Sequence, residues 1–202
     1  NMVIDTLPKA LIQITGMEPE RVAMRRKELG IWHDIRWSEY LEKVKDVAHG
    51  LHELGVRKED HVAIIGENRP EWLYSALGAM SAGATFVGIY STNPVTECEY
   101  VVGHAGAVVY ICEDEEQLDK ALTFRGRTPA LRKMIVWDME GLRDFRDPMV
   151  MSFDDLLALG RKAGEDDPSL FERLVAEGRG EDIAGIIYTS GTTGPPKGAM
   201  LA

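Results

Sequence analysis

The feature that most constrains the fold is a regular alternation of short apolar runs with helical patterns along the middle of the chain. The apolar runs are predicted strands at residues 61–65, 85–89, 107–112, 133–137 and 183–188, and helical spacing fills 70–82, 95–105 and 114–124. Helices of about this length between strands imply right-handed crossovers and therefore a parallel pairing. The predicted fold class is α/β, with a mainly parallel, twisted sheet flanked by helices.

The first part of the chain predicts a small antiparallel start. Residues 22–26 and 31–37 look like two strands joined by a turn in which Gly30 supplies the flexibility that a hairpin needs. Ser38 is the predicted N-cap of a helix that ends at Gly55. These elements precede the alternating region and need a different pairing from it.

Two further features are predicted to lie at the surface. His49 and His52 stand three residues apart on the first long helix, a spacing that could hold a metal, but no third ligand lies near them in sequence, so a solvated face is predicted. Residues 138–182 are less regular and more charged, with a helix capped by Ser152 and ending at Gly160. We expect this region to be a surface excursion.

The stretch 72–96 contains no Asp, Glu, Lys or Arg and is long enough to cross a bilayer. Its Tyr, Ser, Thr and Asn residues dilute the apolar content, and Gly78, Gly83 and Gly88 break it into a helical half and a β-branched half. The prediction is a buried helix followed by a buried strand, with no transmembrane segment.

Charge and cysteine content exclude several classes of function. The formal net charge is −10 and no run rich in Lys or Arg is present, so nucleic acid is not an expected partner. Cys98 and Cys112 have no zinc-type spacing and are predicted to be free thiols of a reducing compartment. The first residues lack the pattern of a signal peptide, so a cytoplasmic location is predicted, with peripheral membrane contact left open.

The segment with the clearest chemistry follows the last predicted strand and reads Thr-Ser-Gly-Thr-Thr-Gly-Pro-Pro-Lys-Gly from Thr189 to Gly198. Glycines let the backbone approach a polyphosphate, hydroxyls donate hydrogen bonds and a lysine neutralises charge. A Walker A loop is excluded because Pro196 stands where its second glycine would be, and residues 178–183 lack the third glycine of a dinucleotide fingerprint. From its composition alone, the segment could also be a flexible connector without a binding role.

The complete string from Tyr188 to Gly198 resembles the signature phosphate loop of the adenylate-forming superfamily and matches it at every specified position. Further strings, in order along the chain, resemble the long-chain fatty acyl-CoA synthetases of that superfamily: residues 6–8, 30–32, 66–72, 88–90 and 113–120. The resemblance runs from about Thr6 to the last residue.

Most of these shorter strings also have purely structural interpretations. Asn68 or Arg69 is expected near a helix cap, with Trp72 anchoring that helix on the sheet, and the acids 113–116 suit a helix start. The loop 90–93 follows a parallel strand, where sheets of this kind tend to bind ligands.

The resemblance implies ATP-dependent activation of a long-chain fatty acid to an acyl-adenylate and then to acyl-CoA, by an AMP-forming ligase. It implies ATP, Mg²⁺ and coenzyme A as cofactors or co-substrates. The residues that it assigns to the ATP phosphates are Thr189, Ser190, Gly191, Thr192, Thr193, Gly194 and Lys197. It assigns Thr189 to magnesium and makes Lys197 the principal charge contact; no residue of the chain is assigned as catalytic.

The resemblance also implies that residues 1–202 are an N-terminal fragment of an AMP-binding domain that ends just after the phosphate loop, with the C-terminal domain absent. Such a fragment is predicted to be inactive by itself. An aryl or medium-chain acyl-CoA ligase is the alternative within this chemistry, and a non-catalytic binding module is the alternative of another class. A homodimer is left open.

Overall fold

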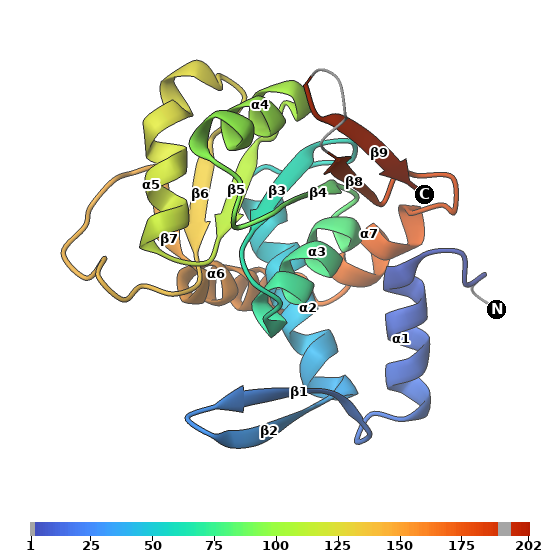
Figure 1. Cartoon of the computed structure of the whole chain (residues 1–202). Coiled ribbons are helices and arrows are strands. Elements are labelled where there is room, and N and C mark those ends of the chain that lie inside the picture. Colours follow the sequence, from blue (N-terminus) through green and yellow to red (C-terminus); the bar gives the residue numbers. More distant parts are fainter. Residues whose placement is uncertain (1–2, 190–194) are drawn as a thin grey trace.

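The computed structural model describes residues 3–189 and 195–202, and a twisted sheet forms the centre of this described part (Figure 1). The strand order is β7-β6-β5-β3-β4-β8-β9. The strands are β3 (His61–Ile65), β4 (Thr85–Ile89), β5 (Val109–Cys112), β6 (Lys133–Val136), β7 (Val150–Ser152), β8 (Gly185–Thr189) and β9 (Lys197–Leu201). All neighbouring pairs are parallel except β8 with β9. The predicted α/β class is confirmed.

Helices cover both faces of the sheet, because the central strands are apolar on both sides. Val62 and Ile64 of β3 belong to one buried cluster, whereas Ala63 and Ile65 belong to another. The first cluster is covered by α1 (Leu7–Met17), α2 (Trp37–Glu53), α3 (Pro70–Ser81), α6 (Phe153–Asp166) and α7 (Leu170–Glu177). The second is covered by α4 (Val95–Ala105) and α5 (Glu115–Phe124), followed by the short helix η1 (Arg125–Arg127).

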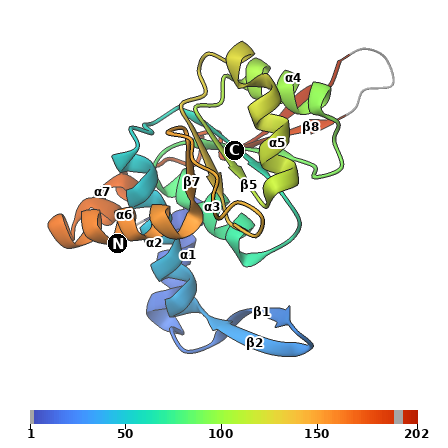
Figure 2. The same cartoon turned by 90° about the vertical axis from the view of Figure 1, so that its left-hand side faces the viewer.

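The predicted antiparallel start is confirmed. Strands β1 (Val22–Glu28) and β2 (Ile31–Arg36) pair as a hairpin that extends away from the main sheet (Figures 1 and 2). Gly30 has a φ of 83°, in the left-handed region that the turn requires. Strand β1 runs two residues further toward the turn than the sequence pattern predicts, and β2 begins at the predicted residue and ends one residue earlier.

The predicted start of α2 is wrong. The N-cap is Arg36, whose backbone N–H donates to Oε2 of Glu39 at 2.7 Å, and Ser38 lies inside the first turn. A glutamate three residues after the cap satisfies an amide that the helix itself cannot, which is half of a capping box. The Glu39 side chain therefore takes the capping role that the sequence pattern assigned to Ser38.

Residues 138–182 are not a surface excursion. Strand β7 pairs with β6, and Phe153 and Leu156 of α6 are buried in the core. The predicted Ser152 cap is confirmed, but the helix continues past Gly160. A Cβ atom at Gly160 would lie 1.8 Å from the carbonyl oxygen of Asp46, so this glycine permits backbone contact between α6 and α2.

The predicted solvated face of His49 is also wrong. Its side chain is buried, with 5% of the residue exposed, and its ring meets that of Phe171 edge-on at a centroid distance of 6.1 Å. Burial lowers the pKa of His49. No group of three or more His, Cys, Asp or Glu residues that could hold a metal ion is found among residues 3–189 and 195–202.

The charge-free stretch 72–96 forms most of α3 and all of β4, as predicted. Ser75, Ala76 and Ala79 of the helix are buried against the core, and the strand is paired on both edges. Among the described helices none is long and apolar enough to span a membrane.

Asp46 gives a pH-dependent prediction for the contact between α2 and α6. Burial raises the pKa of its carboxyl from 3.8 to about 6, although Arg161 opposes this, and Oδ2 accepts no hydrogen bond. A raised pKa means that the contribution of Asp46 to stability is present below pH 3.8 and lost as the pH rises through about 6. Asp46→Asn should therefore raise the free energy of unfolding at pH 8 by about 1–3 kcal/mol and change it little at pH 4.

Urea unfolding at both pH values measures this effect. Glu42→Gln, which changes an exposed carboxylate one turn earlier on α2, is the matched control and should have little effect at either pH. A lower stability of Asp46→Asn at pH 8 would show that attraction to Arg161 outweighs burial.

Candidate functional site

The carboxyl ends of the parallel strands form the candidate site because their connections leave in opposite directions. The loop after β3 leads to α3 on one face of the sheet, whereas the loops after β4 and β5 lead to α4 and α5 on the other. Open α/β sheets bind ligands in the crevice that such a divergence opens. Glycine-rich residues follow β8 at this same end.

Thr189 and Lys197 form the ends of the hairpin that contains the glycine-rich string. They are direct partners in the antiparallel pair of β8 and β9, so their side chains lie on the same face of the ribbon. Both residues are exposed. The hydroxyl and the ammonium group therefore extend from the same face of the ribbon into solvent, an arrangement suited to phosphate binding.

The other residues assigned to the ATP phosphates, Ser190, Gly191, Thr192, Thr193 and Gly194, lie outside the described residues. The two flanking strands are packed closely before and after them. Gly198 lies opposite Tyr188, and a Cβ atom at Gly198 would be only 2.8 Å from Cγ2 of Ile186. Glycine at position 198 therefore leaves room for the side chains of Ile186 and Tyr188 where β9 pairs with β8.

A cavity of about 330 Å³ lies beside this hairpin. It is lined by the loop after β3, the loop after β4 and the side chain of Ile187 on β8. Tyr90 borders it and is 64% exposed, and Ser91 and Thr92 add hydroxyl side chains to the lining. The expectation that the loop 90–93 borders a cavity at the carboxyl end of the sheet agrees with this arrangement.

The buried carboxylate of Glu113 connects the ends of β3 and β5. Its Oε2 accepts from the backbone N–H of Glu67 at 2.6 Å, and its Oε1 lies 2.7 Å from Nε of Arg69. Glu113 is 6% exposed. Gly66 passes so close that a Cβ atom there would lie 2.9 Å from the Cβ of Glu113 and 2.5 Å from Cζ2 of Trp137.

The network continues from Glu113 to the loop after β4. The Glu67 carboxylate accepts from Oγ of Ser91 at 2.6 Å. The ammonium group of Lys120, on α5, donates to the carbonyls of Ser91 and Asn93 at 2.7 and 3.0 Å. Three loops that are distant in sequence are therefore held together around the cavity.

Several of the structural roles predicted for the short strings are confirmed, and the structure adds one ion pair. Arg69 is the N-cap of α3, Trp72 packs on Phe86 of β4, and Asp114 caps α5. The ion pair of Arg69 with Glu113 was not predicted. The sequence contained a signal for it, since both residues follow buried strands that were expected to be parallel.

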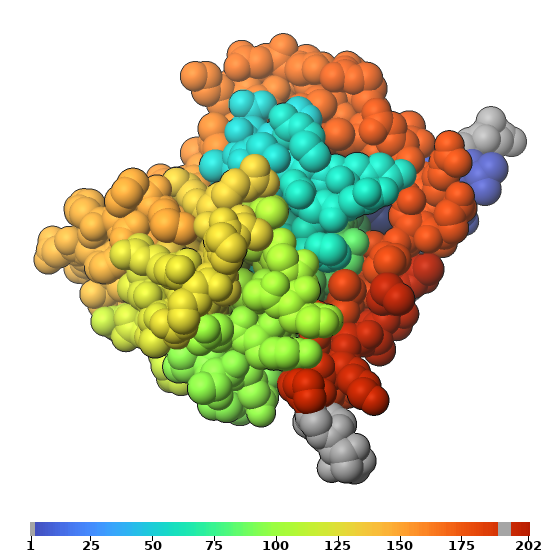
Figure 3. Space-filling model, turned by 90° about the horizontal axis from the view of Figure 1, so that it is seen from above, coloured from blue at the N-terminus to red at the C-terminus, as the bar shows by residue number. Residues whose placement is uncertain are grey.

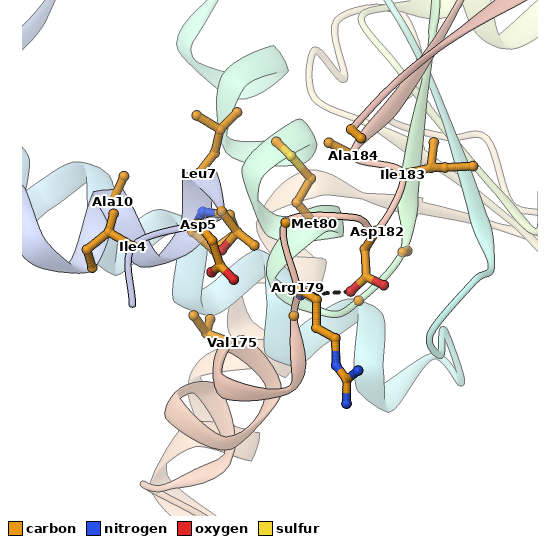
Figure 4. A pocket seen from close by; sticks show the side chains of 17 residues that line it. Ile4, Asp5, Leu7, Ala10, Met80, Val175, Arg179, Asp182, Ile183 and Ala184 are labelled. Carbon is orange, nitrogen blue, oxygen red and sulfur yellow. Dashed lines mark hydrogen bonds between the residues drawn. The ribbon is translucent and has the colours of Figure 1, made fainter. Parts of the chain in front are cut away.

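A second cavity, of about 400 Å³, lies at the opposite end of the sheet (Figure 4). Ala84, Ile183 and Ala184, which line it, precede or begin β4 and β8, and the start of α1 closes another side. The Arg179 backbone N–H donates to Asp182 within this wall. The amino ends of parallel strands are not where sheets of this kind bind ligands, so we do not assign the site there.

Magnesium has few oxygen ligands in the described residues. Mg²⁺ prefers octahedral oxygen coordination, usually one or two carboxylates together with phosphates and water. The nearby carboxylates of Glu113 and Glu67 accept hydrogen bonds from Arg69, Ser91 and a backbone amide. Thr189 by itself does not make a magnesium site, so an ion beside it would take most of its ligands from phosphates and water.

The open, mainly parallel sheet with the hairpin of Thr189 and Lys197 at its carboxyl end is an α/β architecture that adenylate-forming enzymes of known structure share. The model of the family described as AMP-binding enzyme matches residues 13–202, and the chain belongs to that family.

Similar proteins agree with this assignment. The chain is 33% identical over 181 residues to the long-chain-fatty-acid–CoA ligase ACSBG2 of Xenopus laevis, covering 90% of this chain and 24% of that protein. The human ACSBG2 is 34% identical over 176 residues, or 85% of this chain and 25% of that one. The chain thus spans about a quarter of the length of these curated relatives.

Solved structures show the same fold at lower identity. The chain superposes on a putative long-chain-fatty-acid CoA ligase from Rhodopseudomonas palustris with a TM-score of 0.76, 21% identity and coverage of 98% of this chain and 44% of that one. The anthranilate CoA ligase AuaEII, in complex with anthranoyl-AMP, gives a TM-score of 0.74 at 23% identity, covering 96% of this chain and 34% of that one.

Removing the charge of Glu113 should loosen the junction of β3 and β5. Glu113→Gln places an amide opposite two donors and leaves Arg69 without its partner, so we expect the free energy of unfolding to fall by about 2 kcal/mol. Urea unfolding at pH 7 measures this loss. Glu116→Gln, on an exposed position of α5, should change it by less than about 0.5 kcal/mol, and equal losses in the two variants would contradict the assigned role.

Proposed function

We propose that the whole protein to which this chain belongs activates a long-chain fatty acid with ATP and transfers the acyl group to coenzyme A. The observation that supports this most directly is the glycine-rich hairpin at the carboxyl end of the sheet, in a chain of the AMP-binding enzyme family. The long-chain substrate is proposed from the relatives, which are named as long-chain-fatty-acid–CoA ligases.

The proposed reaction has two steps, adenylation of the acid and transfer of the acyl group. A carboxylate oxygen attacks the α-phosphorus of ATP, the bond to the bridging oxygen breaks, and pyrophosphate leaves. The thiolate of coenzyme A then attacks the acyl carbonyl and AMP leaves. In the first step two anions approach each other and the leaving group gathers charge, so donors and cations held around the phosphates lower the barrier.

The chain supplies part of that environment. We propose that Lys197 places its ammonium group against the β- and γ-phosphates and that the Thr189 hydroxyl donates beside it. The five residues 190–194 between them complete the proposed phosphate contacts and lie outside the described part. We propose that Mg²⁺ accompanies ATP and that the Thr189 hydroxyl would supply one of its oxygen ligands, the others coming from phosphates and water.

Two further proposals concern the domain to which the chain belongs and the compartment of the whole protein. We propose that residues 1–202 form the N-terminal part of an AMP-binding domain, in a cytoplasmic protein, since two buried thiols suit a reducing compartment. An aryl or medium-chain acid is the alternative substrate. The anthranilate ligase shares the fold at 23% identity, so the fold alone does not select the acid.

Carboxylate-dependent exchange between ATP and pyrophosphate tests the adenylation step in the whole protein. We expect long-chain acids to support exchange and short-chain, aromatic and amino acids not to. Lys197→Ala should lower exchange by about tenfold or more because a charge-assisted phosphate contact is lost. Exchange driven by aromatic acids would replace the long-chain proposal with the aryl one.

The matched control for that variant is Lys162→Ala, which removes an exposed lysine from α6 far along the chain from the hairpin. It should leave exchange unchanged. If both variants lose exchange equally, the loss reflects net charge rather than a phosphate contact. If no acid drives exchange, the proposed adenylation is wrong and the non-catalytic binding module is the alternative that remains.

Residues 1–202 by themselves should form no acyl-CoA. We propose this because they span only about a quarter of the length of the curated relatives, which are named as long-chain-fatty-acid–CoA ligases. AMP release by a purified sample, expressed in a host that lacks its own acyl-CoA synthetases, measures this. Turnover above the level of the Lys197→Ala sample would contradict it.

A further inference from the structure

Three aromatic rings meet where β8 ends and the glycine-rich string begins. Tyr188 is the last buried residue of β8, with 7% of its surface exposed, and the next residue, Thr189, is exposed. The Tyr188 hydroxyl lies 2.8 Å from Nδ1 of His104. We call Tyr100, His104 and Tyr188 the aromatic cluster.

Helix α4 supplies two of the three rings from one face. Tyr100 and His104 are four residues apart, so they lie on the same side of the helix, and their rings stack at 5.3 Å with an interplanar angle of 19°. The Tyr188 ring stands almost perpendicular to both, at 6.5 Å from Tyr100 and 5.8 Å from His104. Edge-to-face geometry of this kind is attractive beyond simple burial.

The aromatic cluster also lies close to β9, the strand that pairs with β8. Gly198 is paired with Tyr188, and a Cβ atom at Gly198 would lie 3.3 Å from Cζ of the tyrosine ring. One ring is therefore held by α4 on one side and closely covered by β9 on the other. Figures 1 and 3 show α4 beside the hairpin, with the green segment of α4 bordering the red segment of β9.

The N-terminal end of α4 is connected to the wall of the cavity beside the hairpin. Helix α4 follows the loop 90–94, in which Ser91 and Asn93 accept from Lys120. A shift of α4 would thus move both the aromatic cluster and the cavity wall. Partly buried hydrogen bonds at the two ends of the helix oppose such a shift.

We infer that His104 and Tyr100 are positioning residues for the proposed ATP site: through Tyr188 they fix the hairpin ends, Thr189 and Lys197, that face the phosphates. This inference rests on the proposed function. None of the three rings is a catalytic residue, because their action passes through the backbone of β8 and β9.

The test uses the whole protein and three variants of one hydrogen bond. Tyr188→Phe removes only the hydroxyl, and His104→Leu removes only its partner. We expect each to raise the KM for ATP about three- to tenfold with kcat within twofold, as the loss of one hydrogen bond that positions a bound substrate predicts. The double variant should be no worse than either single one, because both remove the same bond.

Two further variants separate positioning from general stability. His104→Asn keeps a polar atom near the place of Nδ1 and should restore most of the ATP affinity. Tyr110→Phe is the matched control, since it removes a buried tyrosine hydroxyl that donates to the carbonyl of Gln117 at 3.1 Å. It should lower stability without changing the KM for ATP. An unchanged KM in a folded Tyr188→Phe protein would overturn the inference.

Hydrogen exchange without substrate keeps the inference separate from the proposed function. The amides of Thr189 and Lys197–Leu201 should exchange faster in Tyr188→Phe than in the parent or in Tyr110→Phe. If the protein shows no carboxylate-dependent exchange of pyrophosphate, the proposed function fails while this measurement still tests the aromatic cluster. Equal amide exchange in all three proteins would overturn the cluster's role.

Discussion

Burial of β3 on both faces and both edges is the constraint on which the rest of the structure depends. Val62, Ala63, Ile64 and Ile65 are completely buried, and the strand pairs with β4 on one side and β5 on the other. No charged side chain can occupy such a strand without a large desolvation cost. Polar chemistry is therefore confined to the ends of the strands, and the crossovers decide which end opens into a crevice.

Much of the fold could be predicted because its cause is local. Alternating buried runs and helical spacing give the strands from β3 to β6, and α4 has the bounds that its apolar spacing predicts. The first residue of a helix was harder to predict where the capping side chain belongs to a residue inside the first turn. Ser38 fits a cap by residue type, but Glu39 reaches the amide of Arg36, and only geometry decides between them.

The string of residues that marks the candidate site is visible in the sequence, but the interactions that hold the loops around it are not. The hairpin with Thr189 and Lys197 follows from one string of residues, whereas Glu113 and Arg69 are 44 positions apart and are joined only because β3 and β5 are neighbours. Strands β7 and β9 were missed for a related reason. Each is short or exposed, and its pairing is specified by the edge of the sheet rather than by its own pattern.

Two buried carboxylates, those of Asp46 and Glu113, lie in different electrostatic surroundings. Asp46, between α2 and α6, has an oxygen with no hydrogen-bond partner, and burial raises its pKa to about 6. Glu113, beside the cavity, is equally buried but accepts from a backbone amide and faces a guanidinium group. A satisfied buried carboxylate holds its neighbours in one arrangement, whereas an unsatisfied one weakens its own contact. The loops that would face ATP are thus held by paired charges and by the aromatic cluster. The carboxylate that burial penalises, which faces Arg161 at 3.6 Å without a hydrogen bond, lies in the contact between two helices on one face of the sheet.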